Sequence, residues 1–304
     1  MVAVRVRAPA KINLQLTVGA RRADGYHDLA TVFQAVSLYD EVVATESTEL
    51  RVTADGDEDI AVTDLPVDET NLAARAATLL AAHLGVEPLV HLHLHKGIPV
   101  AGGMAGGSAD AAAALVACDA LWGGALNRDV LLSLAARLGS DVPFALGGGS
   151  SIGYGRGELL TPVLGRGRFE WVLALAADGL STPAVYAECD RMRTDRVLPA
   201  PRVSDELMTA LRAGDPDALG HALRNDLQPA ACSLYPDLRR TLVAGDEHGA
   251  LGGVVSGSGP TVALLARDAE HAIDLAVALS ATGVAKTVKR AHGPVPGARV
   301  VEEH

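Results

Sequence analysis

The chain has 304 residues, 49% of them hydrophobic, and a formal net charge of −11. This length indicates two domains with sizeable cores, and the acidic balance argues against a nucleic-acid partner. Apolar runs are far shorter than the roughly 20 residues that span a bilayer, and the first residues lack the apolar segment of a secretory signal. The three cysteines have no zinc or redox spacing. We therefore expect a cytoplasmic protein with no membrane partner.

The first half predicts strands followed by helices. Strands are expected on both sides of Pro9, over residues 29–47 and over residues 49–54. A helix is expected over residues 68–85, ending at a glycine, and a second one over residues 127–139, with Asn127 as its cap. Between these helices, LVHLHLHK (residues 89–96) alternates apolar and polar residues, which predicts a half-buried strand. Residues 140–159 are expected to form a glycine-rich turn region.

The second half begins near residue 169 and alternates strands with helices. Strands are expected over residues 171–177, 252–255, 261–266 and 286–292. Helices are expected over residues 183–193, 204–213, 215–231, 236–249 and 268–283. We therefore predict an α+β protein with two domains, residues 1–158 and 159–304.

A glycine-rich segment, KGIPVAGGMAGGSA, follows the histidine-bearing strand and precedes an alanine-rich helix that Ser108 or Asp110 is expected to cap. Free N–H groups at a helix N-terminus, next to a loop without side chains, form an anion site that typically binds phosphate. The segment lacks the Gly-Lys-Ser/Thr ending of a Walker A loop and the G-x-G-x-x-G spacing of a dinucleotide fold. A plain turn is the simpler interpretation.

Four other segments carry candidate chemistry. Lys11 and Asn13 alternate along an early strand and therefore share one face. The pair Tyr26–His27 follows an Asp-Gly turn, Asp141 lies between a helix-ending glycine and a proline, and residues 256–260 (SGSGP) form a second glycine loop. Each has a simpler interpretation: a surface lysine, a tyrosine that covers apolar surface, a capping aspartate, and a plain turn.

Taken together, PAKINL, PVAGGMAGGSA and VVSGSGP resemble, in order and spacing, the three motifs of the GHMP kinases. DGYH and LGSDVPF are similar to the branch that uses ATP to phosphorylate the 2-hydroxyl of a methylerythritol carrying cytidine diphosphate, in non-mevalonate isoprenoid biosynthesis. The resemblance implies an ATP-binding N-terminal domain like domain 2 of ribosomal protein S5, a ferredoxin-like C-terminal domain, and a site in the interdomain cleft. The chain departs from the family's frequent glycine or leucine at Ala101, Met104 and Ala105, which should not stop phosphate binding.

The resemblance also implies roles for individual residues. Asp141 would take the proton from the acceptor hydroxyl, and Lys11 would hold that carboxylate ionised. Because the glycine loop lacks a lysine, Mg²⁺ is expected to accompany ATP, with no protein ligand assigned. The implied ATP-binding residues are Lys96, Pro99, Val100, Ala101, Gly102, Gly103, Met104, Ala105, Gly106, Gly107, Ser108 and Ala109.

The cytidine end of the acceptor needs aromatic rings, and only 3% of this chain is aromatic. The resemblance implies that Tyr26 and Tyr186 clamp the cytosine and that His27 meets the edge of the base. For Tyr186, packing of a helix residue against a sheet is the simpler interpretation. The other implied substrate-binding residues are Asn13, Thr182, Gly257, Ser258 and Gly259.

Three alternatives remain open. His91, His93 and His95 share a strand face, but the outer two lie about 13 Å apart, so a solvent-facing strand is preferred over a metal site. The second alternative is that the chain is another GHMP small-molecule kinase, such as a homoserine kinase. The third is that it is a non-catalytic sensor on the same fold. The retention of Lys11 and Asp141 argues against the sensor. We expect small-molecule substrates only, and a monomer or weak homodimer.

Overall fold

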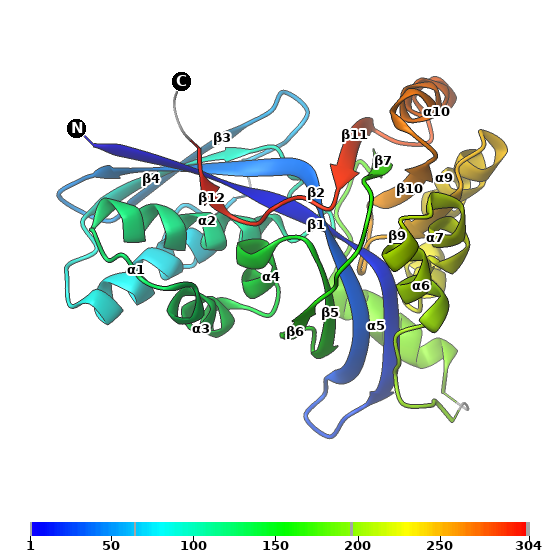
Figure 1. Cartoon of the computed structure of the whole chain (residues 1–304), viewed down its shortest axis with the longest axis horizontal. Helices are drawn as coiled ribbons and strands as arrows, with labels where there is room; N and C mark the ends of the chain where they lie inside the picture. The colour runs from blue at the N-terminus through cyan, green and yellow to red at the C-terminus, as the bar shows by residue number, and fades with distance from the viewer. Residues whose placement is uncertain (1, 64, 195–196, 302–304) are drawn as a thin grey trace.

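The structure, a computed structural model, describes residues 2–63, 65–194 and 197–301. In this part of the chain two β-sheets, of eight and four strands, lie side by side and each is flanked by helices (Figure 1). The strands of the large sheet are β1 (Ala3–Arg21), β2 (His27–Glu46), β3 (Arg51–Gly56), β4 (Val90–Lys96), β5 (Ser150–Gly155), β6 (Leu159–Pro162), β8 (Arg224–Asn225) and β12 (Arg299–Val300). The small sheet, in the order β11-β7-β10-β9, consists of β7 (Phe169–Leu175), β9 (Gly252–Val255), β10 (Val262–Ala266) and β11 (Thr287–Gly293).

Strands β1 and β2 form one long antiparallel ribbon that crosses the molecule (blue in Figure 1). One end of β2 pairs with β4 and the other end pairs with β5. The strands expected on both sides of Pro9 are a single strand, because the pairing register shifts between Pro9 and Ala10. Such an irregularity tolerates a residue without a backbone N–H.

Four helices lie beneath the large sheet in the left half of Figure 1, whereas the small sheet lies at the right. They are α1 (Leu72–Leu84), α2 (Gly106–Leu121), α3 (Arg128–Leu138) and α4 (Val142–Gly147). The alanine-rich α2 packs directly against β1 and β2, since small side chains permit a close approach. The expected cap of α3 and the expected end of α1 are confirmed: Asn127 accepts a hydrogen bond from the N–H of Val130, and Gly85 ends α1 in the left-handed conformation.

The turn region expected over residues 140–159 is wrong. It contains α4 and the hairpin β5–β6. Pro143 is compatible with a first helical turn, where its missing N–H costs nothing, and the glycines after α4 start the hairpin instead of a long loop. The hairpin spans the expected domain boundary at residues 158 and 159, which stays a prediction.

The second half surrounds the small sheet with helices (Figure 1). They are α5 (Thr182–Met192), α6 (Asp205–Ala213), α7 (Pro216–Ala222), α8 (Gln228–Leu234), α9 (Asp237–Glu247) and α10 (Ala269–Thr282). The fully buried Trp171 of β7 joins the two sheets, because its indole N–H donates to the side-chain oxygen of Gln34 on β2, at 2.9 Å.

The single helix expected over residues 215–231 is wrong. The chain leaves α7 at Leu223, which is extended, and forms β8 before α8 begins. Strand β8 pairs in parallel with β1 at Gln15 and Leu16. The pairing partner lies some two hundred residues earlier, so tertiary contact overrides the local helical preference. In the described residues no helix is both long and apolar enough to cross a membrane.

Candidate active site

Two cavities meet at the glycine loop. The larger, about 850 Å³, lies between the two halves of the chain and is called the large cleft; the smaller, about 340 Å³, lies between the loop and the start of α1 and is called the loop pocket. Gly103 and Ala105 line both cavities. The predicted residues that line the large cleft are Lys11, Asn13, Tyr26, His27, Asp141, Thr182, Tyr186, Gly257 and Ser258.

Lys11 is held at the floor of the large cleft by a chain of hydrogen bonds. Its ammonium donates to Asn13 Oδ1 at 2.7 Å, the Asn13 amide donates to Thr31 Oγ1 at 2.8 Å, and the Thr31 hydroxyl donates to the carbonyl of Gln15 at 2.7 Å. Lys11 is only 7% exposed, so the surface-lysine interpretation is wrong. Burial lowers the pKa of the Lys11 ammonium below its ordinary value, and the charge of Asp141 opposes that shift.

Asp141 occupies the position before the first residue of α4, but its side chain makes no capping hydrogen bond. Its backbone carbonyl already accepts the N–H of Ala145 at 3.0 Å, which continues the helix. The interpretation of Asp141 as a capping side chain is therefore wrong, and its carboxylate is available for another role. Asp141 lines the large cleft, together with Lys11.

The glycine loop joins α2 without a side-chain cap. Helix α2 begins at Gly106 after Ala105, which has a φ of 61°, so the expected caps Ser108 and Asp110 are wrong and both residues lie inside the helix. Ala101 also has a positive φ, 56°. Non-glycine residues with a positive φ are uncommon and cluster at functional sites, so these two alanines mark the loop as a strained segment.

The loop also contacts the second glycine loop, residues 256–260. The carbonyl oxygen of Gly103 accepts the hydroxyl of Ser256 at 3.1 Å, and the N–H of Lys11 donates to the carbonyl of Met104 at 3.1 Å. Asn225 of β8 holds the second loop by donating to the carbonyl oxygens of Val255 and Gly257, both at 2.7 Å. Sequence reasoning missed Asn225, and no local signal marks it.

The predicted ATP-binding residues divide into two groups. Those that line the loop pocket are Lys96, Pro99, Val100, Ala101, Gly102, Gly103, Ala105, Gly106 and Gly107. Met104, Ser108 and Ala109 do not line it, and the side chains of Met104 and Ala109 belong to the hydrophobic core. The far wall of the pocket, which sequence reasoning missed, includes Leu65, Pro66, Asn71 and Leu72.

Lys96 lies buried beneath the loop in a triad with two aspartates. Its ammonium forms ion pairs with Asp40 and, at 2.6 Å, with Asp110. The other oxygen of Asp40 accepts the N–H groups of Gly97 and Ile98, at 2.9 and 2.8 Å. Burial raises the pKa of Asp40 well above its ordinary value, and the neighbouring Asp110 raises it further. Sequence reasoning did not identify Asp40, and it considered Asp110 only as a helix cap.

Candidate cytidine contacts gather at one end of the large cleft. His27 is buried, its Nε2 lies 2.8 Å from Asp190 Oδ1, and its ring centroid lies 5.1 Å from that of Tyr186. Burial raises the pKa of Tyr186 to about 12, so its phenol is neutral. Tyr186 lines the cleft and also packs against the core of the second half, so both interpretations of this residue apply. Tyr26 is 54% exposed.

The remaining predicted substrate residues come from the second half. The hydroxyls of Thr182 and Ser258 are hydrogen-bonded at 2.8 Å, which ties α5 to the second glycine loop. Gly257 approaches the first half closely, since a Cβ there would lie 3.4 Å from the Lys11 ammonium. Gly259 does not line the large cleft, and a Cβ there would meet Val255 at 2.9 Å, which indicates a packing role.

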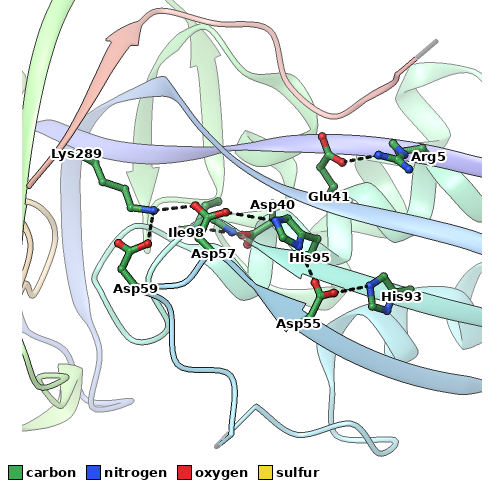
Figure 2. Close-up of polar contacts among 11 residues, drawn as sticks. Arg5, Asp40, Glu41, Asp55, Asp57, Asp59, His93, His95, Ile98 and Lys289 are labelled. Carbon is green, nitrogen blue, oxygen red and sulfur yellow. Dashed lines mark hydrogen bonds and ion pairs between the residues drawn. The ribbon is translucent and has the colours of Figure 1, made fainter. Parts of the chain in front are cut away.

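The histidine-bearing strand β4 takes part in a polar network outside both cavities (Figure 2). His93 and His95 pair with Asp55, and His95 also pairs with Asp57, which binds Lys289 of β11 at 2.8 Å. Its hydrogen bond with Asp55 raises the pKa of His95. In the described residues no group of three or more histidine, cysteine or acidic side chains is suited to a metal ion.

Comparison with known proteins gives two family models, GHMP kinases N terminal domain over residues 71–149 and GHMP kinases C terminal over residues 207–285. A 4-diphosphocytidyl-2-C-methyl-D-erythritol kinase of Streptomyces avermitilis is 56% identical over 300 residues, covering 99% of this chain and 100% of that protein. One of Thermobifida fusca is 57% identical over 303 residues, covering 98% of each chain.

Solved structures are similar as well. A crystal structure of 4-(cytidine 5'-diphospho)-2C-methyl-D-erythritol kinase has a TM-score of 0.78 at 32% identity, covering 95% of this chain and 98% of that one. Homoserine kinase from Cytophaga hutchinsonii has a TM-score of 0.73 at 20% identity, covering 98% and 97%. The second likeness shows the fold alone.

Proposed function

The chain belongs to the family of 4-diphosphocytidyl-2-C-methyl-D-erythritol kinases, within the GHMP kinases, and from this membership we infer that it uses ATP to phosphorylate the 2-hydroxyl of 4-diphosphocytidyl-2-C-methyl-D-erythritol. The products are the 2-phosphate and ADP, in non-mevalonate synthesis of isoprenoid precursors. The expected two-domain α+β GHMP fold is confirmed. The similarity favours this substrate over homoserine, because the homoserine kinase shares only the fold.

The observation that carries the catalytic proposal is the placement of Lys11 and Asp141 in one cleft beside the glycine loop. Phosphoryl transfer depends mainly on positioning and charge stabilisation. The Asp141 carboxylate, which caps no helix, accepts the proton of the acceptor hydroxyl. The Lys11 ammonium stabilises negative charge that develops on the transferred group.

The loop pocket is the proposed site of ATP. Uncapped N–H groups at the start of α2 and the bare glycine loop suit the phosphates, and the apolar wall at Leu65 and Leu72 suits the base. The ammonium of Lys96 already binds two carboxylates, so its role is to anchor the loop from below. Gly103 and Ala105 line both cavities, so the γ-phosphate of ATP in the loop pocket would lie at the boundary with the large cleft.

We also propose that Mg²⁺ accompanies ATP. Hard cations prefer oxygen ligands, and the buried Oδ1 of Asp110 has no hydrogen-bond partner among the described residues. This atom belongs to a residue of the loop pocket, so Asp110 is the residue that would hold the ion. When bound, Mg²⁺ would neutralise the charge of the phosphates, because the glycine loop has no lysine to do so.

The acceptor is proposed to lie along the large cleft with its cytosine between Tyr26 and Tyr186. His27, which Asp190 orients, is proposed to meet the edge of the base. Asn13, Thr182, Gly257 and Ser258 are proposed to contact the diphosphate and the erythritol part. We further propose that the protein is cytoplasmic, a monomer or weak homodimer, and without a nucleic-acid partner.

An ADP-release assay with a panel of acceptor alcohols tests this function. We expect turnover with the alcohol that carries cytidine diphosphate and none with homoserine. Asp141→Asn keeps the shape of the side chain but removes the base, so turnover should fall about 10²–10⁴-fold while ATP still binds. Asp129→Asn, on the exposed first turn of α3, is the matched control. Near-normal turnover of Asp141→Asn would contradict the assignment.

A further inference from the structure

Two hairpin tips meet at the cytidine end of the large cleft. Arg156 follows Gly155 in the turn between β5 and β6, and Tyr26 lies in the turn between β1 and β2. The guanidinium carbon of Arg156 lies 5.1 Å from the centroid of the Tyr26 ring. Both residues line the large cleft. This distance is within the range of a cation–π interaction, which Arg forms more often than Lys.

The ring of Tyr26 needs such a contact. It is 54% exposed, and the hydrogen bond from its backbone N–H to Asp24 Oδ1, at 3.0 Å, fixes the chain but not the ring. Ordering a free side chain when a ligand binds costs affinity, and a ring that is already ordered avoids this cost. Because Arg156 lies over one face of the ring, a base would stack on the other face.

Acidic groups lie close to Arg156. Glu158 Oε2 accepts the backbone N–H of Arg156 at 2.6 Å, and its Oε1 lies 4.0 Å from the Arg156 Nε. The low pKa of Asp24 comes mainly from its hydrogen bond with Arg22, with a smaller contribution from Arg156. Arg137, which also lines the cleft, has no such ion pair in the described part of the chain. Arg156 is therefore better placed to support Tyr26 than to bind the diphosphate.

We propose that Arg156 is a positioning residue for the acceptor, which stacks on the outer face of Tyr26 and holds that ring ready for the cytosine. This inference rests on the proposed function, because it requires an acceptor that carries cytidine. Arg156 acts on the affinity for the base, through Tyr26. It leaves the phosphoryl-transfer step and the binding of ATP unchanged.

The test compares Arg156→Ala with the wild type by calorimetry, using cytidine, CMP and CDP as probes. A cation–π contact at a partly exposed site corresponds to about a 2- to 5-fold change in affinity. We expect all three ligands to weaken by this same factor, since they share the base. In turnover assays the acceptor KM should rise by the same factor, while kcat and the KM for ATP stay constant. Weakening of CMP and CDP without weakening of cytidine would show that Arg156 reads phosphate, and would overturn the proposal.

Two controls isolate the path through Tyr26. In a Tyr26→Ala background, Arg156→Ala should have no further effect on cytidine binding, whereas an unchanged effect would overturn the proposal. Arg137→Ala removes the same charge from the same cleft without touching Tyr26, so its cytidine affinity should match the wild type. An equal loss of cytidine affinity in Arg137→Ala would show that the effect comes from the positive charge of the cleft in general, and would overturn the proposal.

Failure of the proposed function is recognised separately, because the wild-type protein would then not phosphorylate the cytidine-bearing acceptor. Failure of this inference leaves that activity intact and leaves Arg156→Ala with wild-type affinity for cytidine. Thermal unfolding of each variant shows whether it is folded, and a conservative variant, Arg156→Lys, should retain part of the cytidine affinity if Arg156→Ala does not fold.

Discussion

The contact between the two glycine loops makes a quantitative prediction at Gly103. Its φ is +75°, and a Cβ at this position would lie 2.6 Å from the carbonyl oxygens of Ser256 and Gly259. These oxygens cannot move freely, because the second loop is closed by a hydrogen bond from the Gly259 N–H to the Ser256 carbonyl at 2.8 Å and by one from the Ser256 N–H to the Thr261 carbonyl at 2.9 Å. Gly103→Ala must therefore push the two loops apart.

The cost has two parts that a control variant separates. A left-handed alanine costs about 1–2 kcal/mol, and a methyl group forced into a packed site costs about 1–3 kcal/mol. Gly103→Ala should thus lower the free energy of unfolding by about 2–5 kcal/mol. Gly85, which ends α1, has a φ of +71° and nothing within 4 Å of an added Cβ. Gly85→Ala should therefore lose only about 1–2 kcal/mol.

Activity distinguishes the two variants further. A misplacement of about 1 Å in a site costs about 10²-fold in rate, so kcat of Gly103→Ala should fall by roughly this factor at saturating substrates, while Gly85→Ala keeps wild-type turnover. Denaturant unfolding measures the stabilities, and ADP release measures turnover. If Gly103→Ala matches Gly85→Ala in stability and turns over normally, the close approach of the loops does not position the site and the reasoning is wrong.

Three further predictions follow from the buried charges and the aromatic rings. Because burial lowers the pKa of Lys11, kcat/KM should fall on the alkaline side at a pH below about 10.4, the ordinary lysine value; a flat profile to that pH would contradict this. Lys96→Met should lower the free energy of unfolding by about 3–5 kcal/mol at pH 7. The loss should be smaller at lower pH, because protonation of Asp40 removes one of the two buried negative charges, and denaturant unfolding at several pH values measures it. Tyr26→Ala and Tyr186→Ala should each weaken the acceptor about 5- to 150-fold in calorimetry, with ATP binding unchanged.

The elements that the sequence predicts correctly depend on local signals. The alternation of residues 89–96 becomes β4, whose apolar side chains are buried and whose histidines are partly exposed. The helix over residues 127–139 becomes α3, with its asparagine cap in place. The shared face of Lys11 and Asn13 follows from strand periodicity, and the structure joins the two side chains by a hydrogen bond.

The features that the sequence does not predict depend on partners far away in the chain. Strand β8 interrupts a helical pattern because β1 pairs with it. The triad beneath the glycine loop combines Asp40 of β2, Lys96 of β4 and Asp110 of α2. The sequence of each segment alone does not indicate that the other two lie beside it. The pairing of His27 with Asp190 joins two halves of the chain. Spacing along the sequence carries no information on such contacts.

One long strand relates the parts of the candidate site to each other. Strand β1 carries Lys11 and Asn13, and its backbone N–H at Lys11 binds the carbonyl of Met104 in the first glycine loop. A few residues later the same strand pairs with β8, whose Asn225 holds the second glycine loop by two carbonyl oxygens. Both loops are thus positioned from β1 through backbone and amide hydrogen bonds, which tolerate little displacement. The distance between the proposed ATP site and the proposed catalytic pair is therefore set by a strand in the large sheet. The second half of the chain contributes the second glycine loop, whose position follows from the pairing of β8 with β1.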